Sequence, residues 1–220
     1  MNEKLILKLI IVDDHVLLRD ALASLINSFN ECKVIGTASN GEEMIAVIRK
    51  TEIPDLIIMD LNMPKMDGYD STFWLQSNYP DIKILILTMF DSEIALIRLL
   101  KIGVRGFLKK DVHPNELKDA LLAVANDGYY YSNNATSKLA NFFHKSHMNH
   151  FSLDKALLSE QEIQFLKLAS SEMTYKEIAQ TMHLTPRAID GYRDGLFEKL
   201  DVKSRVGLAI YAVKNGIVNF

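Results

Sequence analysis

Runs of consecutive apolar residues alternate with longer segments of helical periodicity in the first part of the chain. Unbroken apolar runs are typical of strands that are buried on both faces, and apolar positions three or four apart predict the helices that cover them. This strand–helix order repeats five times over about residues 5–126. We therefore predict an α/β fold with a doubly wound, five-stranded parallel sheet.

The last part of the chain has a purely helical pattern. Two capping boxes, SEQE at residues 159–162 and TYKE at residues 174–177, mark the starts of helices. Thr185 precedes Pro186, which is favoured at a first helical position, and Ser204 provides another N-cap. We predict a small all-α domain of four helices.

Between these regions the character of the chain changes to a polar stretch with a modest helical patch at residues 139–143. This composition favours a linker that contains one short helix. The predicted organisation is a first domain at residues 1–128, a linker at residues 129–156 and a second domain at residues 157–220.

Four of the apolar runs in the first domain end in polar residues. In chain order these are Asp13 with Asp14, then Asp60, Thr88 and Lys110. Because the carboxyl ends of parallel strands meet at one edge of a sheet, where ligands bind, topology brings three carboxylates, a hydroxyl and an ammonium together. A single aspartate often only ends a strand, but this whole set in this order favours a site.

The chemistry of such a site follows from its charges. Confined carboxylates repel one another, which is costly unless a cation binds between them. Mg²⁺ prefers hard carboxylate oxygens and keeps positions for water or phosphate oxygens. One carboxylate can then attack a phosphoryl group and form an acyl phosphate. Lys110 can pair with the phosphate as a point charge, and the Thr88 hydroxyl can donate to another oxygen.

Composition indicates the class of protein and its cellular compartment. A chain of 220 residues with 48% hydrophobic and 24% charged residues is typical of two ordinary globular domains. The single cysteine, Cys32, cannot form an intramolecular disulfide, which fits a reducing cytoplasm. The apolar stretch near the start is too short to span a bilayer and lacks the layout of a signal peptide. We expect a cytoplasmic protein with no membrane partner.

The motifs around the predicted site resemble the receiver domain of two-component response regulators, a flavodoxin-like fold. They are IVDDH at residues 11–15, MDLNMPKMDG at 59–68, LT at 87–88 and GFLKKD at 106–111. The resemblance implies that Asp60 is the phosphoacceptor. It also implies that Asp14, Asp60 and the main-chain carbonyl of Asn62 bind Mg²⁺, with Asp13 acting mostly through a metal-bound water.

The same resemblance assigns the residues that respond to phosphorylation. Thr88 would be the switch hydroxyl, and Phe107 would be the switch aromatic, although it lacks the ring hydroxyl of the more usual tyrosine. Of the two adjacent lysines, alignment on GFLKKD gives the phosphate-pairing role to Lys110 and not to Lys109.

Three segments of the helical region resemble the LuxR-type helix-turn-helix, so the whole chain resembles a NarL/FixJ-type response regulator. They are LSEQE at residues 158–162, KEIA at 176–179 and EKLDVKSR at 198–205. The helix at residues 186–200 would enter the major groove of double-stranded DNA. The residues expected at the DNA interface are Lys176, Thr185, Arg187, Asp190, Gly191, Arg193, Asp194, Lys199, Lys203 and Arg205.

The exposed face of that helix is unusual for a DNA reader, because Asp190, Asp194 and Glu198 outnumber Arg187. Two interpretations stay open here. In the first, acids accept from cytosine N4 while basic residues hold phosphates, namely Lys176, Arg187, Arg193, Lys199, Lys203 and Arg205. In the second, the domain has lost ordinary DNA reading and serves as a phospho-dependent protein-binding adaptor. An aspartate-nucleophile phosphatase is a third hypothesis, with Asp13 as nucleophile.

The last helix carries apolar residues at helical spacing, namely Val206, Ala209, Ile210 and Val213. They either pack in the core or, as the resemblance implies, form a dimer interface. Taken together, we predict a transcription regulator, not a conventional enzyme, which takes part only in its own aspartyl phosphorylation and hydrolysis. A sensor histidine kinase would phosphorylate Asp60, and a homodimer would then bind DNA.

Overall fold

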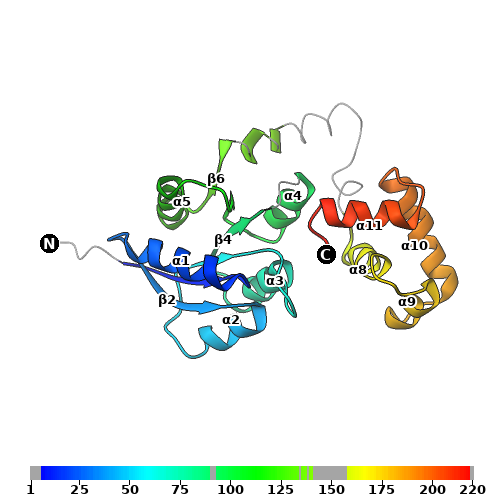
Figure 1. The fold of residues 1–220 in the computed structure, drawn as a ribbon, viewed down its shortest axis with the longest axis horizontal. Helices are drawn as coiled ribbons and strands as arrows, with labels where there is room; N and C mark the ends of the chain where they lie inside the picture. Colours follow the sequence, from blue (N-terminus) through cyan, green and yellow to red (C-terminus); the bar gives the residue numbers. More distant parts are fainter. Residues whose placement is uncertain (1–5, 90–92, 134, 138, 141–157, 219–220) are drawn as a thin grey trace. The chain divides into compact units, whose positions relative to one another are not determined.

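The computed structural model describes residues 6–89, 93–133, 135–137, 139–140 and 158–218 (Figure 1). The chain forms two compact units that divide near residue 138. Each unit has its own buried core. None of the described helices is long and apolar enough to cross a membrane.

The first unit contains a parallel sheet in the order β2-β1-β3-β4-β5-β6. Its strands are β1 (Leu7–Val12), β2 (Cys32–Ala38), β3 (Leu56–Met59), β4 (Lys83–Thr88), β5 (Gly106–Lys109) and β6 (Tyr130–Tyr131). The chain order reverses between β1 and β3, which is the doubly wound arrangement expected from the sequence. The middle strands are buried on both faces, since neighbouring residues such as Ile10 and Ile11 are both 0% exposed.

Helices separate the strands along the chain, as Figure 1 shows. They are α1 (Val16–Asn27), α2 (Gly41–Ile48), α3 (Gly68–Asn78), α4 (Glu93–Lys101) and α5 (Pro114–Asn126). Leu22 and Ile26 of α1 and Leu117 and Leu121 of α5 belong to one apolar cluster with alternate residues of the strands. These two helices therefore cover one face of the sheet.

The sheet has one strand more than the five predicted. Tyr130 and Tyr131 pair in parallel with Gly106 and Phe107 and form the edge strand β6, so they belong to the first unit and not to the linker. The turn into this strand depends on Gly128, whose φ of +88° is in the left-handed region that favours glycine. The Tyr130 amide then donates to the Arg105 carbonyl at 2.9 Å.

The short helix predicted at residues 139–143 lies only partly within the described residues. Residues 133, 135–137 and 139–140 are helical, so helical structure begins earlier than predicted. Ser132 caps this segment, because its hydroxyl accepts from the Ala135 amide at 3.3 Å. The rest of the predicted linker, residues 141–156, lies outside the described residues.

The second unit contains the four predicted helices. They are α8 (Glu160–Ala169), α9 (Tyr175–Thr181), α10 (Pro186–Lys199) and α11 (Arg205–Lys214). Both predicted capping boxes form, with Ser159 paired to Glu162 and Thr174 paired to Glu177. The core of the unit is built around Phe165, which is 0% exposed and stacks on Tyr175 and Tyr192.

Candidate functional site

The acidic residues of the first unit meet at the carboxyl ends of β1 and β3. These strands are in register with Val12 opposite Met59, so the next residues, Asp13 and Asp60, lie side by side. Lys110 follows β5 and reaches both, with its Nζ 2.9 Å from Asp13 Oδ2 and 2.8 Å from Asp60 Oδ2. All three side chains are at most 5% exposed. The three charges therefore form one buried network.

Asp14 and His15 complete this cluster on its more open side. Asp14 is partly exposed, and its Oδ1 lies 3.0 Å from Nδ1 of His15 but makes no hydrogen bond. Ligand atoms of Asp13, Asp14, His15 and Asp60 all lie within 4.8 Å of one another. A buried carboxylate oxygen without a hydrogen bond, beside two further carboxylates, fits a hard cation such as Mg²⁺.

Burial and neighbouring charges act on Asp60 in opposite directions. Burial raises the pKa of the Asp60 carboxyl above its ordinary value, the Lys110 ammonium opposes this, and the Asp13 carboxylate adds to it. Burial alone would lower the pKa of Lys110, but its bonds to Asp60 and Asp13 raise that pKa above the ordinary value. Lys110 is thus held as a cation between two carboxylates, in the place where a phosphoryl group on Asp60 would need a counter-charge.

The loop after β3 fixes the position of Asp60. Its Oδ1 accepts from the Leu61 amide at 2.8 Å, and the Gly68 amide donates to the Leu61 carbonyl at 2.8 Å. A Cβ at residue 68 would lie only 2.4 Å from the Asp60 carbonyl oxygen, so the close approach requires glycine. Asn62 lies in this loop, partly buried, two residues after Asp60.

The expected switch residues lie on β4 and β5, the next two strands of the sheet after β3. Thr88 ends β4 and is 0% exposed, and its carbonyl accepts from the Lys110 amide at 3.0 Å. Phe107 on β5 is 4% exposed and pairs with Ile86 on one side and with Tyr131 of β6 on the other. The backbone hydrogen bond between Lys110 and Thr88 thus joins the residue expected to pair with phosphate directly to an expected switch residue.

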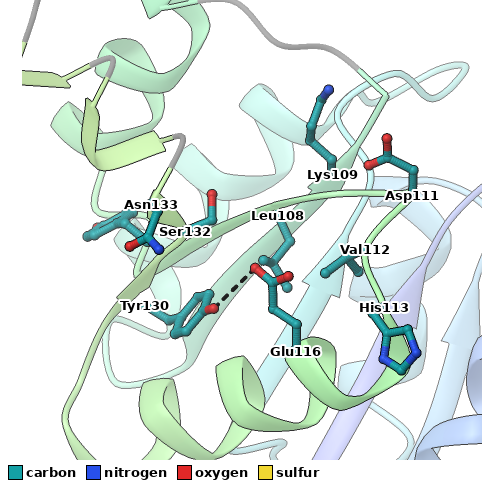
Figure 2. A pocket seen from close by; sticks show the side chains of 10 residues that line it. Leu108, Lys109, Asp111, Val112, His113, Glu116, Tyr130, Ser132 and Asn133 are labelled. Atoms are coloured by element: carbon teal, nitrogen blue, oxygen red, sulfur yellow. Dashed lines mark hydrogen bonds between the residues drawn. The ribbon is translucent and has the colours of Figure 1, made fainter.

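Lys109 lies in different surroundings from Lys110. It lines a pocket of about 610 Å³ formed by β5, the loop after it, the start of α5 and β6, together with Asp111, His113 and Glu116 (Figure 2). In this pocket the Tyr130 hydroxyl donates to Glu116 Oε1 at 3.2 Å. The structure therefore brings Lys110, and not Lys109, to the acidic cluster.

In the second unit, α10 presents the expected polar face. Arg187, Asp190, Gly191, Asp194 and Glu198 are all exposed. Ile189 and Leu196 are at most 1% exposed and anchor the opposite face in the core. Lys176, Thr185 and Lys203 are also exposed, and the Thr185 hydroxyl accepts from the Ala188 amide at 3.2 Å as an N-cap.

Two basic residues assigned to phosphate contacts have other partners in the structure. Arg205 donates through Nε to the Ala169 carbonyl at 2.8 Å and through Nη2 to the carbonyls of Ser171 and Met173. Lys199 Nζ lies 2.8 Å from Glu162 Oε2. In the structure, their charges join α8 and the loop after it to the rest of the unit, and the DNA contacts expected of both residues stay predictions. Sequence alone does not show such partners, which are more than 30 residues away.

His15 was not among the residues expected at the site. The signal for it was present in the sequence, because it directly follows Asp13 and Asp14. Its main-chain amide donates to Asp13 Oδ1 at 2.9 Å. The His15 amide therefore holds Oδ1 of Asp13, while Lys110 contacts its Oδ2.

Comparisons with known proteins agree with this geometry. Residues 9–122 match the family described as response regulator receiver domain, and residues 156–212 match bacterial regulatory proteins of the luxR family. The response regulator GacA of Pseudomonas syringae pv. syringae (strain B728a) is 31% identical over 213 residues, covering 97% of this chain and 98% of that protein. The oxygen regulatory protein NreC of Staphylococcus carnosus (strain TM300) is 30% identical over 222 residues, covering 97% and 100%.

A solved structure shares the fold at lower identity. RcsB from Salmonella enterica serovar Typhimurium, bound to promoter rprA in the presence of the phosphomimetic BeF3-, has a TM-score of 0.68 at 21% identity. The likeness covers 94% of this chain and 98% of that one.

The first domain carries a buried acidic cluster with a lysine, and the second is a helix-turn-helix unit. This combination is that of a regulator with a receiver domain and an output domain. More specifically, the chain belongs to the two-component response regulators of NarL/FixJ type, with a receiver domain and a LuxR-type DNA-binding domain.

Proposed function

We propose that a sensor histidine kinase phosphorylates Asp60 and that this phosphorylation controls DNA binding and transcription. The observation that carries the proposal is the convergence of Asp13, Asp14, Asp60 and Lys110 at the carboxyl edge of the sheet. Asp14, Asp60 and the Asn62 carbonyl would hold Mg²⁺, with Asp13 acting through water. The bound ion would neutralise the incoming phosphoryl group.

The residues of the chain have distinct parts in the transfer. A carboxylate oxygen of Asp60 forms a bond to phosphorus while the bond from phosphorus to the donor nitrogen or oxygen breaks, and the donor leaves with that electron pair. Lys110 exchanges its contact with Asp60 for one with a phosphate oxygen, and the Thr88 hydroxyl donates to another. Phe107 then repacks beside Thr88. Apart from this phosphorylation and its hydrolysis, we assign no catalysis to the protein.

The DNA-binding form would be a homodimer that uses α11. Val206 is 67% exposed and Ile210 is 50% exposed, so these two residues are not part of the core of the unit. Exposed apolar side chains one helical turn apart suit an interface between two copies. A structure of similar fold supports a dimer on DNA, since two RcsB dimers were solved bound to two parallel DNAs.

A second candidate function is the phospho-dependent adaptor, because Asp190, Asp194 and Glu198 give α10 an acidic exposed face. The matched receiver and luxR families do not favour it, nor do they favour the aspartate-nucleophile phosphatase. If the adaptor hypothesis is right, the full chain will fail to bind DNA even when phosphorylated at low salt.

The phosphoacceptor is tested with acetyl phosphate and Mg²⁺ on the full chain. We expect close to one acid-labile phosphate per wild-type chain, located on Asp60 by peptide mapping, and none on the Asp60→Asn variant. An amide is nearly isosteric but cannot act as the nucleophile. Asp81→Asn, which changes an exposed aspartate just before the amino end of β4, at the edge of the sheet opposite to the cluster, is the matched control and should be phosphorylated normally. Full incorporation into Asp60→Asn, or phosphate on Asp13, would reject the assignment.

A further inference from the structure

Two aspartates on the exposed face of α10 share one arginine of the same helix. Arg193 Nη1 lies 2.8 Å from Asp190 Oδ1, and Arg193 Nε lies 2.8 Å from Asp194 Oδ1. The guanidinium also lies over the Tyr175 ring, 5.5 Å from its centroid. Two carboxylates and the Tyr175 ring therefore hold the guanidinium, and its planar, rigid geometry fixes the orientation of both carboxylates.

The carboxylates themselves stay accessible. Their side chains are 55% and 65% exposed, whereas that of Arg193 is 29% exposed. Arg193 contacts Oδ1 of each carboxylate, which leaves Oδ2 of each outside its two hydrogen bonds. Because Arg193 cancels one of the two negative charges, the group presents two oriented acceptors to a DNA groove at a reduced electrostatic cost.

The space around these acceptors is open. Gly191 is next to Asp190, and Gly195 is next to Asp194, yet an added Cβ would meet nothing within 4 Å at either position. Neither glycine is required by packing or by a positive φ, although glycine weakens a helix relative to alanine. What the two glycines do provide is room for another molecule to approach the helix beside the two acids.

The base edge that suits such acceptors can be identified by its chemistry. In the major groove, cytosine offers the N4 amino donor, whereas guanine and thymine offer acceptors that repel a carboxylate. Adenine places its N7 acceptor beside its N6 donor, which makes it a poorer partner for a carboxylate than cytosine. Four helical residues span about 6 Å, and stacked bases are about 3.4 Å apart, so the two aspartates reach bases one or two steps apart.

We infer that α10 selects cytosine at two nearby positions of its DNA site through Asp190 and Asp194, with Arg193 as the residue that positions them. This inference rests on the proposed function, in which α10 enters the major groove. It replaces the phosphate contact expected for Arg193 and names the bases that the acidic face reads.

The test is a binding selection on random duplexes with the full chain phosphorylated by acetyl phosphate, comparing the wild type with three variants. Asp190→Asn and Asp194→Asn keep the shape but add an amide donor, and asparagine pairs with the N6 and N7 of adenine. Each is expected to shift one position from cytosine to adenine by at least about fivefold. Glu198→Gln, an exposed acid of the same face outside the arginine group, should leave both positions unchanged.

Arg193→Lys distinguishes positioning from phosphate binding. Lysine keeps the charge but loses the fork, so we expect total affinity and its salt dependence to persist while the preference for cytosine weakens at both positions. Unchanged preferences in both aspartate variants would overturn the inference. So would an Arg193→Gln variant that lowers the salt slope by about one unit without changing the preference, because this is the behaviour of a phosphate contact. Wild-type chain that binds no DNA would instead reject the proposed function.

Discussion

The acidic residues of the two units differ in burial and in where their cationic partner comes from. In the receiver unit, Asp13 and Asp60 are buried and depend on a cation from another strand, Lys110. In the helical unit, Asp190 and Asp194 are exposed and share one arginine of their own helix. Buried charges are costly when a partner is lost, whereas exposed pairs contribute little to stability. Substitutions of these acids and their partners should therefore change chemistry and stability in the first unit, and selectivity in the second.

The largest effect is expected for Lys110→Ala without Mg²⁺. It leaves two buried carboxylates without their cation, and losing one partner of a buried pair costs about 3–5 kcal/mol. Because an ammonium is not a metal ligand, Mg²⁺ should still bind and restore part of the lost stability. Denaturant unfolding at neutral pH with and without Mg²⁺ measures both effects.

Lys109→Ala is the control for this variant, since Lys109 lines the pocket formed by β5, α5 and β6 instead. It should change the free energy of unfolding by less than about 1 kcal/mol and leave the response to phosphorylation intact. Equal effects of the two substitutions, or reversed ones, would show that Lys110 is not the partner of the acids.

The next largest effect on stability is expected for Arg205. Like Lys110 in the receiver unit, Arg205 bonds to groups that are distant in the sequence. Its hydrogen bonds to three carbonyls hold the end of α8 and the loop after it. Hydrogen bonds from a charged donor contribute about 1.5–3 kcal/mol, so Arg205→Ala should destabilise the unit by about that amount.

Lys203→Ala is the matched control for Arg205→Ala, because Lys203 is a basic residue two positions earlier in the chain and its side chain is exposed. This variant should unfold like the wild type and lower the salt slope of DNA binding by about one unit. If Arg205→Ala kept wild-type stability and changed only the salt slope, Arg205 would be a phosphate contact as first expected.

A smaller, pH-dependent effect is expected at the pair of Glu162 and Lys199. Burial opposes ionisation of Glu162, but the bonds from Lys199 and from the Ser159 amide lower its pKa below the ordinary value. A lowered folded pKa contributes stability that is present above the unfolded pKa and is lost as the pH falls through the folded value. Lys199→Met should therefore cost about 0.5–1 kcal/mol near neutral pH.

The measurement is urea unfolding of both chains across the acid range. The difference between them should shrink as the pH falls below the ordinary pKa of a glutamate. A difference that stays constant, or that grows in acid, would mean that the ion pair does not set the pKa of Glu162.

The smallest effect has the opposite sign. Gly191→Ala should stabilise α10 by about 0.5–1 kcal/mol, because alanine favours a helix and its Cβ meets nothing within 4 Å. It should nevertheless weaken DNA binding, since the methyl group occupies room beside Asp190. Gly195→Ala should stabilise equally but affect binding less, because residue 195 lies further around the helix towards Lys199. Thermal unfolding and a DNA titration compare the two, and equal loss of affinity would contradict this placement.

Sequence predicted the features that depend on local pattern. Apolar runs identified β1, β3, β4 and β5, and the polar residues that end them identified the acidic cluster. The capping motifs identified the helices of the second unit in the same way. These features were predictable because strand burial and helix capping involve neighbouring residues.

The acidic cluster also joins distant residues, but the order of the strands brings them together. Features that depend on distant partners without such a pattern were not predicted. The edge strand β6 has two residues, too few for any periodicity, and it exists only because β5 is there to pair with it. The sequence shows the charges of Arg205 and Lys199 but not the groups they contact. Partners of that kind follow from the tertiary fold.

The central claim is that phosphorylation of Asp60 in one unit controls DNA binding by the other. The direct measurement is the DNA affinity of the full chain, titrated with and without acetyl phosphate and Mg²⁺, for wild type and Asp60→Asn. The wild type should bind more tightly after treatment, and Asp60→Asn should keep its untreated affinity. A wild type whose affinity does not change, or an Asp60→Asn variant that responds to acetyl phosphate as the wild type does, would contradict the account.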